Sequence, residues 1–230
     1  GIDSALTSTL CAKTGLPTLC LEMPIKQQQS QVDRAQEHIR WLRKHHTNVA
    51  EKMVLLYPVF DALSKAVAAD EQKNEDLLSL ANTRARLRMV TLYYYAACKR
   101  YLVAGTGNKV EDFGVGFYTK YGDGGVDLSP IADLSKTQVR ALASTLGVDQ
   151  KILNAPPTDG LWDDGRNDEE QLDATYEQLE WAMTQHAAGK SPADFVGENA
   201  RVFEVFLSHH NANKHKMEPI PVCSIPKQLL

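Results

Sequence analysis

The chain has 230 residues, enough to bury a full hydrophobic core, and a single domain is its simplest organisation. Its formal net charge is −4 and no apolar run approaches the roughly 20 residues that span a bilayer, so neither nucleic acid nor a membrane is an expected partner. Its four scattered cysteines include no C-x-x-C pair, which argues against zinc or a disulfide framework and fits a reduced, cytoplasmic environment.

The N-terminal third of the sequence predicts a helix, a strand and a long helical region. Residues 5–14 favour a helix that Gly15 ends. The apolar segment 16–23 predicts a strand, which Pro24 closes. Residues 32–69 carry apolar side chains at helical spacing, and Pro58 should kink or divide them. These helices either cover the sheet or form a contact between subunits.

The middle of the chain predicts one long helix and one short strand. The helix covers residues 76–98 and carries Arg84, Arg86 and Arg88, which cannot all share one helix face. Some of these arginines must face water, and one is free to face an anion. The apolar run 101–104 then predicts a short buried strand.

Residues 105–136 form a glycine-rich stretch of mixed charge directly after that strand. The glycines at its start allow a sharp turn. Its lysines suit phosphates, and its carboxylates suit magnesium or ribose hydroxyls. A strand edge followed by such a loop is typical of nucleotide sites in α/β folds. The sequence therefore predicts an α/β protein with a nucleotide site at this loop.

The C-terminal part predicts further helices around a polar loop. Ser135 should cap one helix, and residues 169–187 predict another. Ser191 and Pro192 begin a last helix, whose apolar side chains, including Val196, should face inward. The acidic segment 162–170 reads as a mobile loop near the site.

Several ordered motifs resemble the ammonia-dependent NAD synthetase family. They are GIDS at residue 1, NTRARLRM at 82, GTGNKVEDFGVGFYTKYGDGGVD at 105, LSPIADLSK at 128, PPTDGLW at 156 and HKM at 215. Together they extend over nearly the whole chain, which makes the signal specific. GIDS resembles the end of the family's SGGxDS loop, so the first strand and the start of that loop are expected to precede Gly1.

The resemblance implies a Rossmann-like three-layer sandwich, with a mostly parallel sheet and helices on both faces. It implies one synthetase domain over residues 1–230, acting as a homodimer with the deamido-NAD site across the interface. It assigns ATP binding to Gly1, Ile2, Asp3, Ser4, Thr106, Lys136 and Thr158. It assigns deamido-NAD binding to Arg86, Lys120, Asp127, His215 and Lys216. It assigns magnesium binding to Asp3 and Glu111.

The implied reaction is the ATP-dependent amidation of deamido-NAD to NAD, through an adenylated intermediate, with release of AMP and pyrophosphate. No side chain stands out as a covalent nucleophile. No part of the chain resembles the amidase domain of glutamine-dependent relatives, so ammonia is the expected nitrogen source.

Some alternatives stay open at this stage. The chain has GTGNKVED where many relatives have GTDHAAEA, and Asp112 beside Glu111 leaves two candidate carboxylates for the metal. Relatives have glycine at the position of Asp173, which bears on helix packing. Asp3 alone would read as a helix cap. The rival functions are another enzyme of the ATP-pyrophosphatase group and a nucleotide-binding module without turnover.

Overall fold

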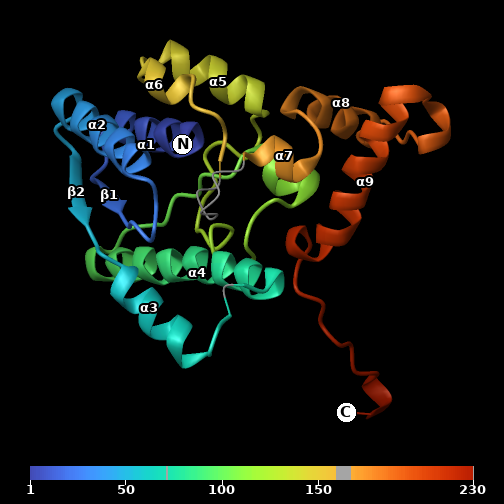
Figure 1. Cartoon of the computed structure of the whole chain (residues 1–230), viewed down its shortest axis with the longest axis horizontal. Coiled ribbons are helices and arrows are strands. Elements are labelled where there is room, and N and C mark those ends of the chain that lie inside the picture. Colours follow the sequence, from blue (N-terminus) through green and yellow to red (C-terminus); the bar gives the residue numbers. More distant parts are fainter. Residues whose placement is uncertain (71, 159–166, 230) are drawn as a thin grey trace.

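A computed structural model describes residues 1–70, 72–158 and 167–229 of the chain. Strands β1 (Thr18–Glu22) and β2 (Val49–Met53) pair in parallel, with Thr18 opposite Val49. Helices α1 (Ile2–Lys13) and α2 (Gln29–His45) pack against this pair (Figure 1). The α/β class with a parallel sheet is thereby confirmed, and among the described residues the sheet has two strands.

The other helices surround the strand pair and a central group of loops (Figure 1). They are α3 (Tyr57–Ala66), α4 (Asn74–Lys99), the π-helix η1 (Lys109–Val115), α5 (Lys136–Thr145), α6 (Gln150–Leu153), α7 (Asp168–Leu172), α8 (Tyr176–Ala187) and α9 (Gly197–Met217), with short 3-10 turns at Pro192–Asp194 and Lys227–Leu229. In Figure 1 α4 runs along one side of the body, α5 and α6 lie opposite it, and α9 leads into an extended tail. No helix in the described ranges is long and apolar enough to cross a membrane.

The predicted strand at residues 101–104 is reduced to a single bridge between Ala104 and Leu128. The reason lies in the hydrogen bonds next to the bridge. The backbone N–H of Val103 donates to the carboxylate of Asp127 at 2.8 Å, where a ladder would need a backbone carbonyl. The Asp127 side chain thus takes the place of the backbone carbonyl that would continue the strand pairing.

The prediction of helices over residues 32–69 is wrong in its centre, where β2 lies. The β2 sequence VAEKM does not alternate between apolar and polar residues. In the structure only Val49 of its five residues is buried. Backbone pairing with β1 decides its conformation, which tertiary contacts often do against local pattern. Pro58 lies in the first turn of α3, where its missing N–H costs nothing.

Two further helix predictions need correction near the C-terminus. The single helix expected over residues 169–187 is split into α7 and α8 at Asp173, whose φ of +54° is left-handed. Glycine adopts this conformation at less cost than aspartate, which gives a physical reason for glycine there in relatives. The last helix begins only at Gly197, and Val196 before it is 87% exposed, so its predicted inward orientation is wrong.

Two buried apolar clusters hold the elements that carry the central loops. One joins η1 to α8 and α9 through Val110, Val115, Phe203 and Phe206. The other joins α1 to α5 through members that include Leu6 and Val139. Because η1, α1 and α5 are each anchored by such packing, the polar side chains at their ends are held in fixed positions relative to one another.

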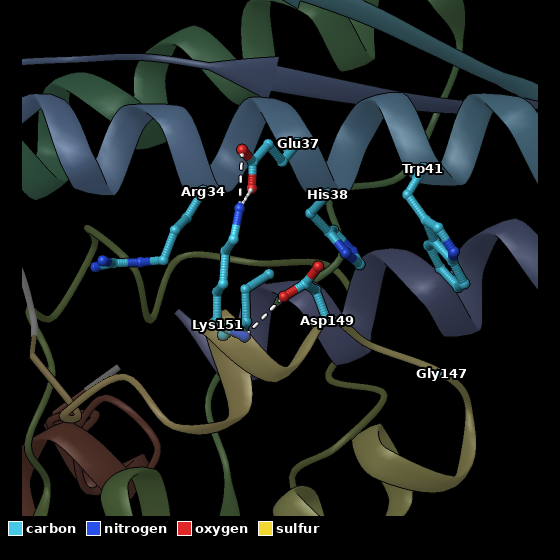
Figure 2. Close-up of a pocket in the computed structure, with 8 residues that line it drawn as sticks. Arg34, Glu37, His38, Trp41, Gly147, Asp149 and Lys151 are labelled. Atoms are coloured by element: carbon cyan, nitrogen blue, oxygen red, sulfur yellow. Dashed lines mark hydrogen bonds and ion pairs between the residues drawn. The ribbon is translucent and has the colours of Figure 1, made fainter.

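His38 on α2 connects α2 to α1 and lines a small pocket of about 100 Å³ (Figure 2). The ring is 7% exposed, and its Nε2 lies 3.1 Å from both the Ala5 carbonyl oxygen and the Ser8 hydroxyl. Across the pocket, Lys151 forms an ion pair with Glu37 at 3.0 Å. Burial lowers the pKa of His38, and its bond to the Ala5 carbonyl only partly offsets this effect.

The lowered pKa of His38 predicts a loss of stability in mild acid. The unfolded chain takes up this proton near pH 6.5, before the folded protein does, so the contribution is complete above that pH and is lost as the pH falls. The slope for one proton is at most about 1.4 kcal/mol per pH unit. Urea unfolding between pH 7.5 and 5 should show a shallower decline for His38→Gln than for wild type. His45→Gln, on the exposed side of α2, is the control and should keep the wild-type slope.

Candidate active site

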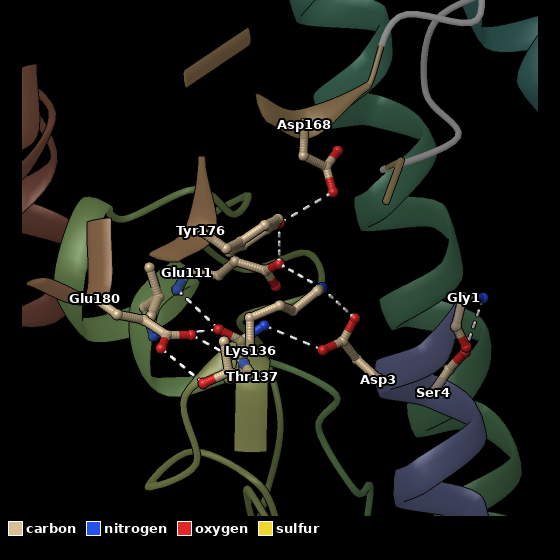
Figure 3. A network of polar contacts seen from close by, with 11 residues as sticks. Gly1, Asp3, Ser4, Glu111, Lys136, Thr137, Asp168, Tyr176 and Glu180 are labelled. Atoms are coloured by element: carbon tan, nitrogen blue, oxygen red, sulfur yellow. Dashed lines mark hydrogen bonds and ion pairs between the residues drawn. The ribbon is translucent and has the colours of Figure 1, made fainter. Parts of the chain in front are cut away.

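Lys136 lies at the centre of a polar network between four segments of the chain (Figure 3). It is the first residue of α5, which Ser135 caps as predicted by accepting the Gln138 N–H. Its side chain is only 2% exposed. Its Nζ lies 2.7 Å from Asp3 Oδ2 and 2.9 Å from Glu111 Oε1. A lysine in the first helical turn opposes the helix dipole, and these two carboxylates compensate it.

The charges in this network stabilise one another. Burial lowers the pKa of Lys136, but the nearby charges of Glu111 and Asp3 outweigh burial and raise it overall. Burial raises the pKa of Glu111, and Lys136 opposes that rise. Lys136 therefore stays protonated, and it stabilises two carboxylates that would otherwise repel each other.

The same two carboxylates fit a magnesium ion in their chemistry. Asp3 Oδ2 and Glu111 Oε1 converge on one point, at which Lys136 Nζ lies. Magnesium is usually held by one or two carboxylates, with phosphate oxygens and water completing its shell. Within the described ranges no group of three or more His, Cys, Asp or Glu gathers as a metal site.

Asp3 does not cap α1, although the residue lies in the helix's first turn. Its Oδ2 faces Lys136, and its Oδ1 accepts from the side-chain amide of Asn108 at 3.1 Å. Gly1, Ile2 and Ser4 occupy the same helix end, where Ser4 Oγ donates to the Gly1 carbonyl at 3.0 Å. Among these predicted ATP-binding residues at the N-terminus, Asp3 contacts Lys136 directly.

The sequence did not point to the side chains that bond to this network from α8, of which Tyr176 is the first. The Tyr176 hydroxyl lies 2.5 Å from Glu111 Oε1 and 3.2 Å from Asp168 Oδ2, and its ring lies beneath Lys136 Nζ at 4.7 Å. Burial, and then the charges of Glu111 and Asp168, raise the pKa of Tyr176. The hydroxyl is therefore a fixed hydrogen-bond donor.

Glu180 on α8 fixes the start of α5 in the same way. It accepts from the Thr137 N–H at 2.9 Å and from the Thr137 hydroxyl at 2.7 Å. No local signal marks these supporting side chains, because Tyr176 and Glu180 meet their partners only through tertiary packing.

Thr106, a predicted ATP ligand, lies in the turn next to α1. The Thr7 hydroxyl on α1 bonds to the carbonyl oxygen of Gly105 at 3.4 Å. At Gly107 a Cβ atom would stand only 2.0 Å from Asp112 Oδ2, so the Asp112 carboxylate occupies the space that glycine leaves. Burial, and then the charges of Glu111 and Asp123, raise the pKa of Asp112 to about 7. Glu111, and not Asp112, shares Lys136 with Asp3.

Four of the predicted deamido-NAD residues lie together between α4 and α9. The guanidinium of Arg86 on α4 reaches the Lys120 carbonyl at 3.3 Å, and Lys120 Nζ donates to the His215 carbonyl at 2.6 Å. Lys216 Nζ donates to the carbonyls of Gly116 and Tyr118, both at 2.8 Å. Its bond to Gly116 lies just beyond the C-terminal end of η1, whose other end carries Glu111. The π-helix thus connects the two groups of predicted ligands.

Asp127 and the other arginines of α4 make separate contacts. Asp127 accepts from the Tyr93 hydroxyl on α4 at 3.1 Å. Arg84 is buried over the Phe60 ring, and Arg88 donates to the Met23 carbonyl at 3.1 Å. Of the three arginines, Arg86 alone is exposed, which is the accessibility that an anion ligand needs.

Part of the predicted site lies outside the described residues. Thr158 is the last described residue before the gap at 159–166, and it lies in a segment without regular structure. The loop predicted over residues 162–170 falls largely in that gap. At residue 167 the side chain of Asn167 caps α7 by accepting from the Glu170 N–H at 2.8 Å.

Comparison with known proteins adds an independent line of evidence. The family model described as NAD synthase matches residues 1–220. An NH(3)-dependent NAD(+) synthetase of Carboxydothermus hydrogenoformans is 37% identical, with 85% of this chain and 78% of that protein covered. An NH(3)-dependent NAD(+) synthetase of Methanocaldococcus jannaschii is 36% identical, with 96% and 85% covered.

Two solved structures resemble the whole arrangement. An NMN synthetase from Francisella tularensis superposes with a TM-score of 0.81 at 33% identity, covering 99% of this chain and 86% of that one. An NH3-dependent NAD synthetase from Campylobacter jejuni superposes with a TM-score of 0.75 at 25% identity, covering 97% and 86%. The similarity therefore includes both the sequence motifs and the placement of the helices.

Proposed function

Because the chain belongs to the NAD synthase family, we propose that it is a ligase that forms the amide of NAD from deamido-NAD, ATP and ammonia. The observation that carries this proposal is the buried Lys136 between Asp3 and Glu111, at the motifs that the family shares. A match over residues 1–220 supports treating the chain as one synthetase unit.

The reaction has two steps. The nicotinate carboxylate of deamido-NAD attacks the α-phosphorus of ATP, forming an acyl adenylate and releasing pyrophosphate. Ammonia then attacks the acyl carbon, AMP leaves with the bonding electrons, and the extra proton passes to solvent. The adenylate is needed because a free carboxylate is a poor acylating agent.

The chain's own residues would position the reactants and neutralise charge. Asp3 and Glu111 would hold magnesium, which when bound supplies positive charge to the polyphosphate. Lys136, whose Nζ lies between these two carboxylates, would turn away from them to donate a charged hydrogen bond to a phosphate oxygen, and Thr106 would contact the nucleotide beside it. Preorganised donors of this kind stabilise the charge that grows in the transition state without reorganisation.

The nicotinate substrate would lie toward α4 and α9. Arg86, Lys120, His215 and Lys216 supply cationic or donor groups for its phosphates, and Asp127 an acceptor for a hydroxyl. Arg86 is exposed, whereas Lys120 and Lys216 are half-buried, and the side chains of all three bond to backbone carbonyls.

A coupled assay tests the proposal directly. Purified protein is given deamido-NAD, ATP and magnesium, with either ammonium or glutamine, and NAD, AMP and pyrophosphate are measured. NAD formed with ammonium, in equal amount to AMP and pyrophosphate, supports the ligase. ATP binding without pyrophosphate release would instead favour a nucleotide-binding module.

A second candidate substrate follows from the similarity to the NMN synthetase of Francisella tularensis. The acid mononucleotide lacks the adenylate half of deamido-NAD but presents the same nicotinate carboxylate. Comparing kcat/KM for the two acids under identical conditions separates the candidates. A higher value for the mononucleotide would move the chain to the NMN-forming class.

We also expect a homodimer, because α3 and α4 expose large apolar side chains. On α4 these are Leu78, Val90 and Tyr94, which are 54%, 59% and 63% exposed. Clustered apolar exposure of this kind commonly marks a protein interface. Light scattering at micromolar concentration should give twice the mass of the chain, and Val90→Glu should lower it. A monomeric mass for the wild type would contradict the expectation.

A further inference from the structure

Asn108 bonds to the carboxylate of Asp3 and to the backbone of Glu111, and it is fully buried, with 0% exposure. Its Oδ1 accepts from the backbone N–H groups of Val110 and Glu111, both at 3.1 Å. Its Nδ2 donates to Asp3 Oδ1 at 3.1 Å. A single side chain therefore contacts both residues that share Lys136, although Asp3 and Asn108 lie 105 positions apart.

Helix capping explains only half of this arrangement. An acceptor at the N-cap of η1 satisfies two backbone N–H groups, and aspartate or serine would serve equally well. Capping gives no reason for the amide donor that reaches α1. Because Oδ1 receives two N–H donors, the orientation of the amide is determined, and Nδ2 must face Asp3.

The bond from Asn108 divides the two oxygens of Asp3 between two tasks. Oδ1 is engaged by Asn108, and Oδ2 is turned to the point that it shares with Glu111 Oε1. Without the amide donor, the carboxylate of Asp3 is free to rotate about its terminal torsion, which has broad, shallow minima. The convergence of the two carboxylates therefore depends on Asn108.

We propose that Asn108 is a positioning residue for the cation site, holding Asp3 and Glu111 so that one oxygen of each faces the same point. The proposal rests on the proposed function, because it assumes that this point receives the cation that accompanies ATP. Partners that orient metal-binding side chains typically change metal affinity about 10- to 100-fold when they are replaced.

The test variant is Asn108→Ser, which keeps a capping hydroxyl, is too short to reach Asp3 and adds no charge beside the cation site. Mn²⁺ binding in the presence of ATP is followed by the loss of the free-ion EPR signal. We expect an affinity about 10- to 100-fold weaker than wild type. The KM for Mg²⁺ in turnover should rise by a similar factor, more than kcat falls.

Asn213→Ala is the matched control. Its side-chain amide also bonds to η1, donating to the Val115 carbonyl at 2.9 Å, but it does not touch either carboxylate. Its Mn²⁺ affinity should stay within about twofold of wild type. Asn108→Asp, which keeps the size and the capping acceptor but adds a carboxyl group beside Asp3, is the second variant if Asn108→Ser does not fold.

The outcomes distinguish this inference from the proposed function. Wild-type Mn²⁺ affinity in a folded Asn108→Asp or Asn108→Ser protein would leave capping as the only role of Asn108 and overturn the inference. Absence of Mn²⁺ binding by the wild-type protein with ATP would instead count against the cation site itself. A loss equal to that of Asn213→Ala would show that any disturbance of η1 suffices, which also overturns it.

Discussion

Replacing Lys136 with alanine should lower kcat about 100- to 1,000-fold, the usual cost of removing one preorganised electrostatic group from a site. Lys136 Nζ is 2% exposed and lies within 2.9 Å of both Asp3 and Glu111. Without it, the charge that grows on the phosphate would lose the cation that lies between the two carboxylates. Rates are measured at saturating ATP and deamido-NAD.

The variant has a second expected effect, on folding. Breaking a buried ion pair by removing one partner typically costs about 3–5 kcal/mol, because the remaining charge is left uncompensated. Circular dichroism must therefore show that Lys136→Ala is folded at the assay temperature. Without nucleotide, the same variant should bind Mn²⁺ more tightly than wild type, since Nζ no longer occupies the point between the carboxylates.

Lys109→Ala is the control for Lys136→Ala. Lys109 is the first residue of η1 and pairs with Asp133 at the surface, where ion pairs contribute about 0–1 kcal/mol. It should keep kcat within a few fold of wild type. A near-normal rate for folded Lys136→Ala would exclude the role assigned to the lysine.

Gly107→Ala should destabilise the protein by roughly 1–3 kcal/mol, the usual range for overpacking. The added Cβ would stand 2.0 Å from Asp112 Oδ2, well inside contact distance. Asp112 cannot withdraw with its backbone, because its N–H donates to the Asn108 carbonyl at 3.0 Å. Its carboxylate is the end of a rotatable side chain, so that side chain must rotate away from residue 107.

A double-mutant cycle separates this clash from other effects of the substitution. If the contact with Asp112 is the cause, Gly107→Ala combined with Asp112→Ala should be about as stable as Asp112→Ala alone. The coupling energy from urea unfolding should then nearly equal the cost of the single glycine change. Additive effects of the two substitutions would show that the clash is relieved elsewhere.

Sequence patterns predicted best the elements that have strong local signals. The helix expected over residues 76–98 is observed as Asn74–Lys99, and Ser135 caps α5 as expected. The strand expected over residues 16–23 is observed as Thr18–Glu22. In each case long periodicity, a capping side chain or an apolar run agrees with the tertiary fold.

Patterns failed where tertiary contacts decide the conformation. β2 carries no strand alternation, and its pairing with β1 overrides helical spacing. The sequence of the π-helix is too short and too charged to show a periodic pattern of apolar residues. Asn108, directly before Lys-Val-Glu, was nevertheless an available capping signal. The roles of Asn108 and Tyr176 depend on contacts with residues 105 and 65 positions away, which no local pattern encodes.

The span of the Lys136 network along the chain has a thermodynamic consequence. Asp3 and Lys136 lie 133 positions apart, and the bonds join α1, η1, α5 and α8. Local opening of any one of these helices would disrupt the site. Ligand binding should therefore stabilise all of these helices together against unfolding. A ligand at 100 times its dissociation constant should then add about 2.7 kcal/mol to global stability. Amide hydrogens in α1 and in α5 should slow their exchange together, as one cooperative unit.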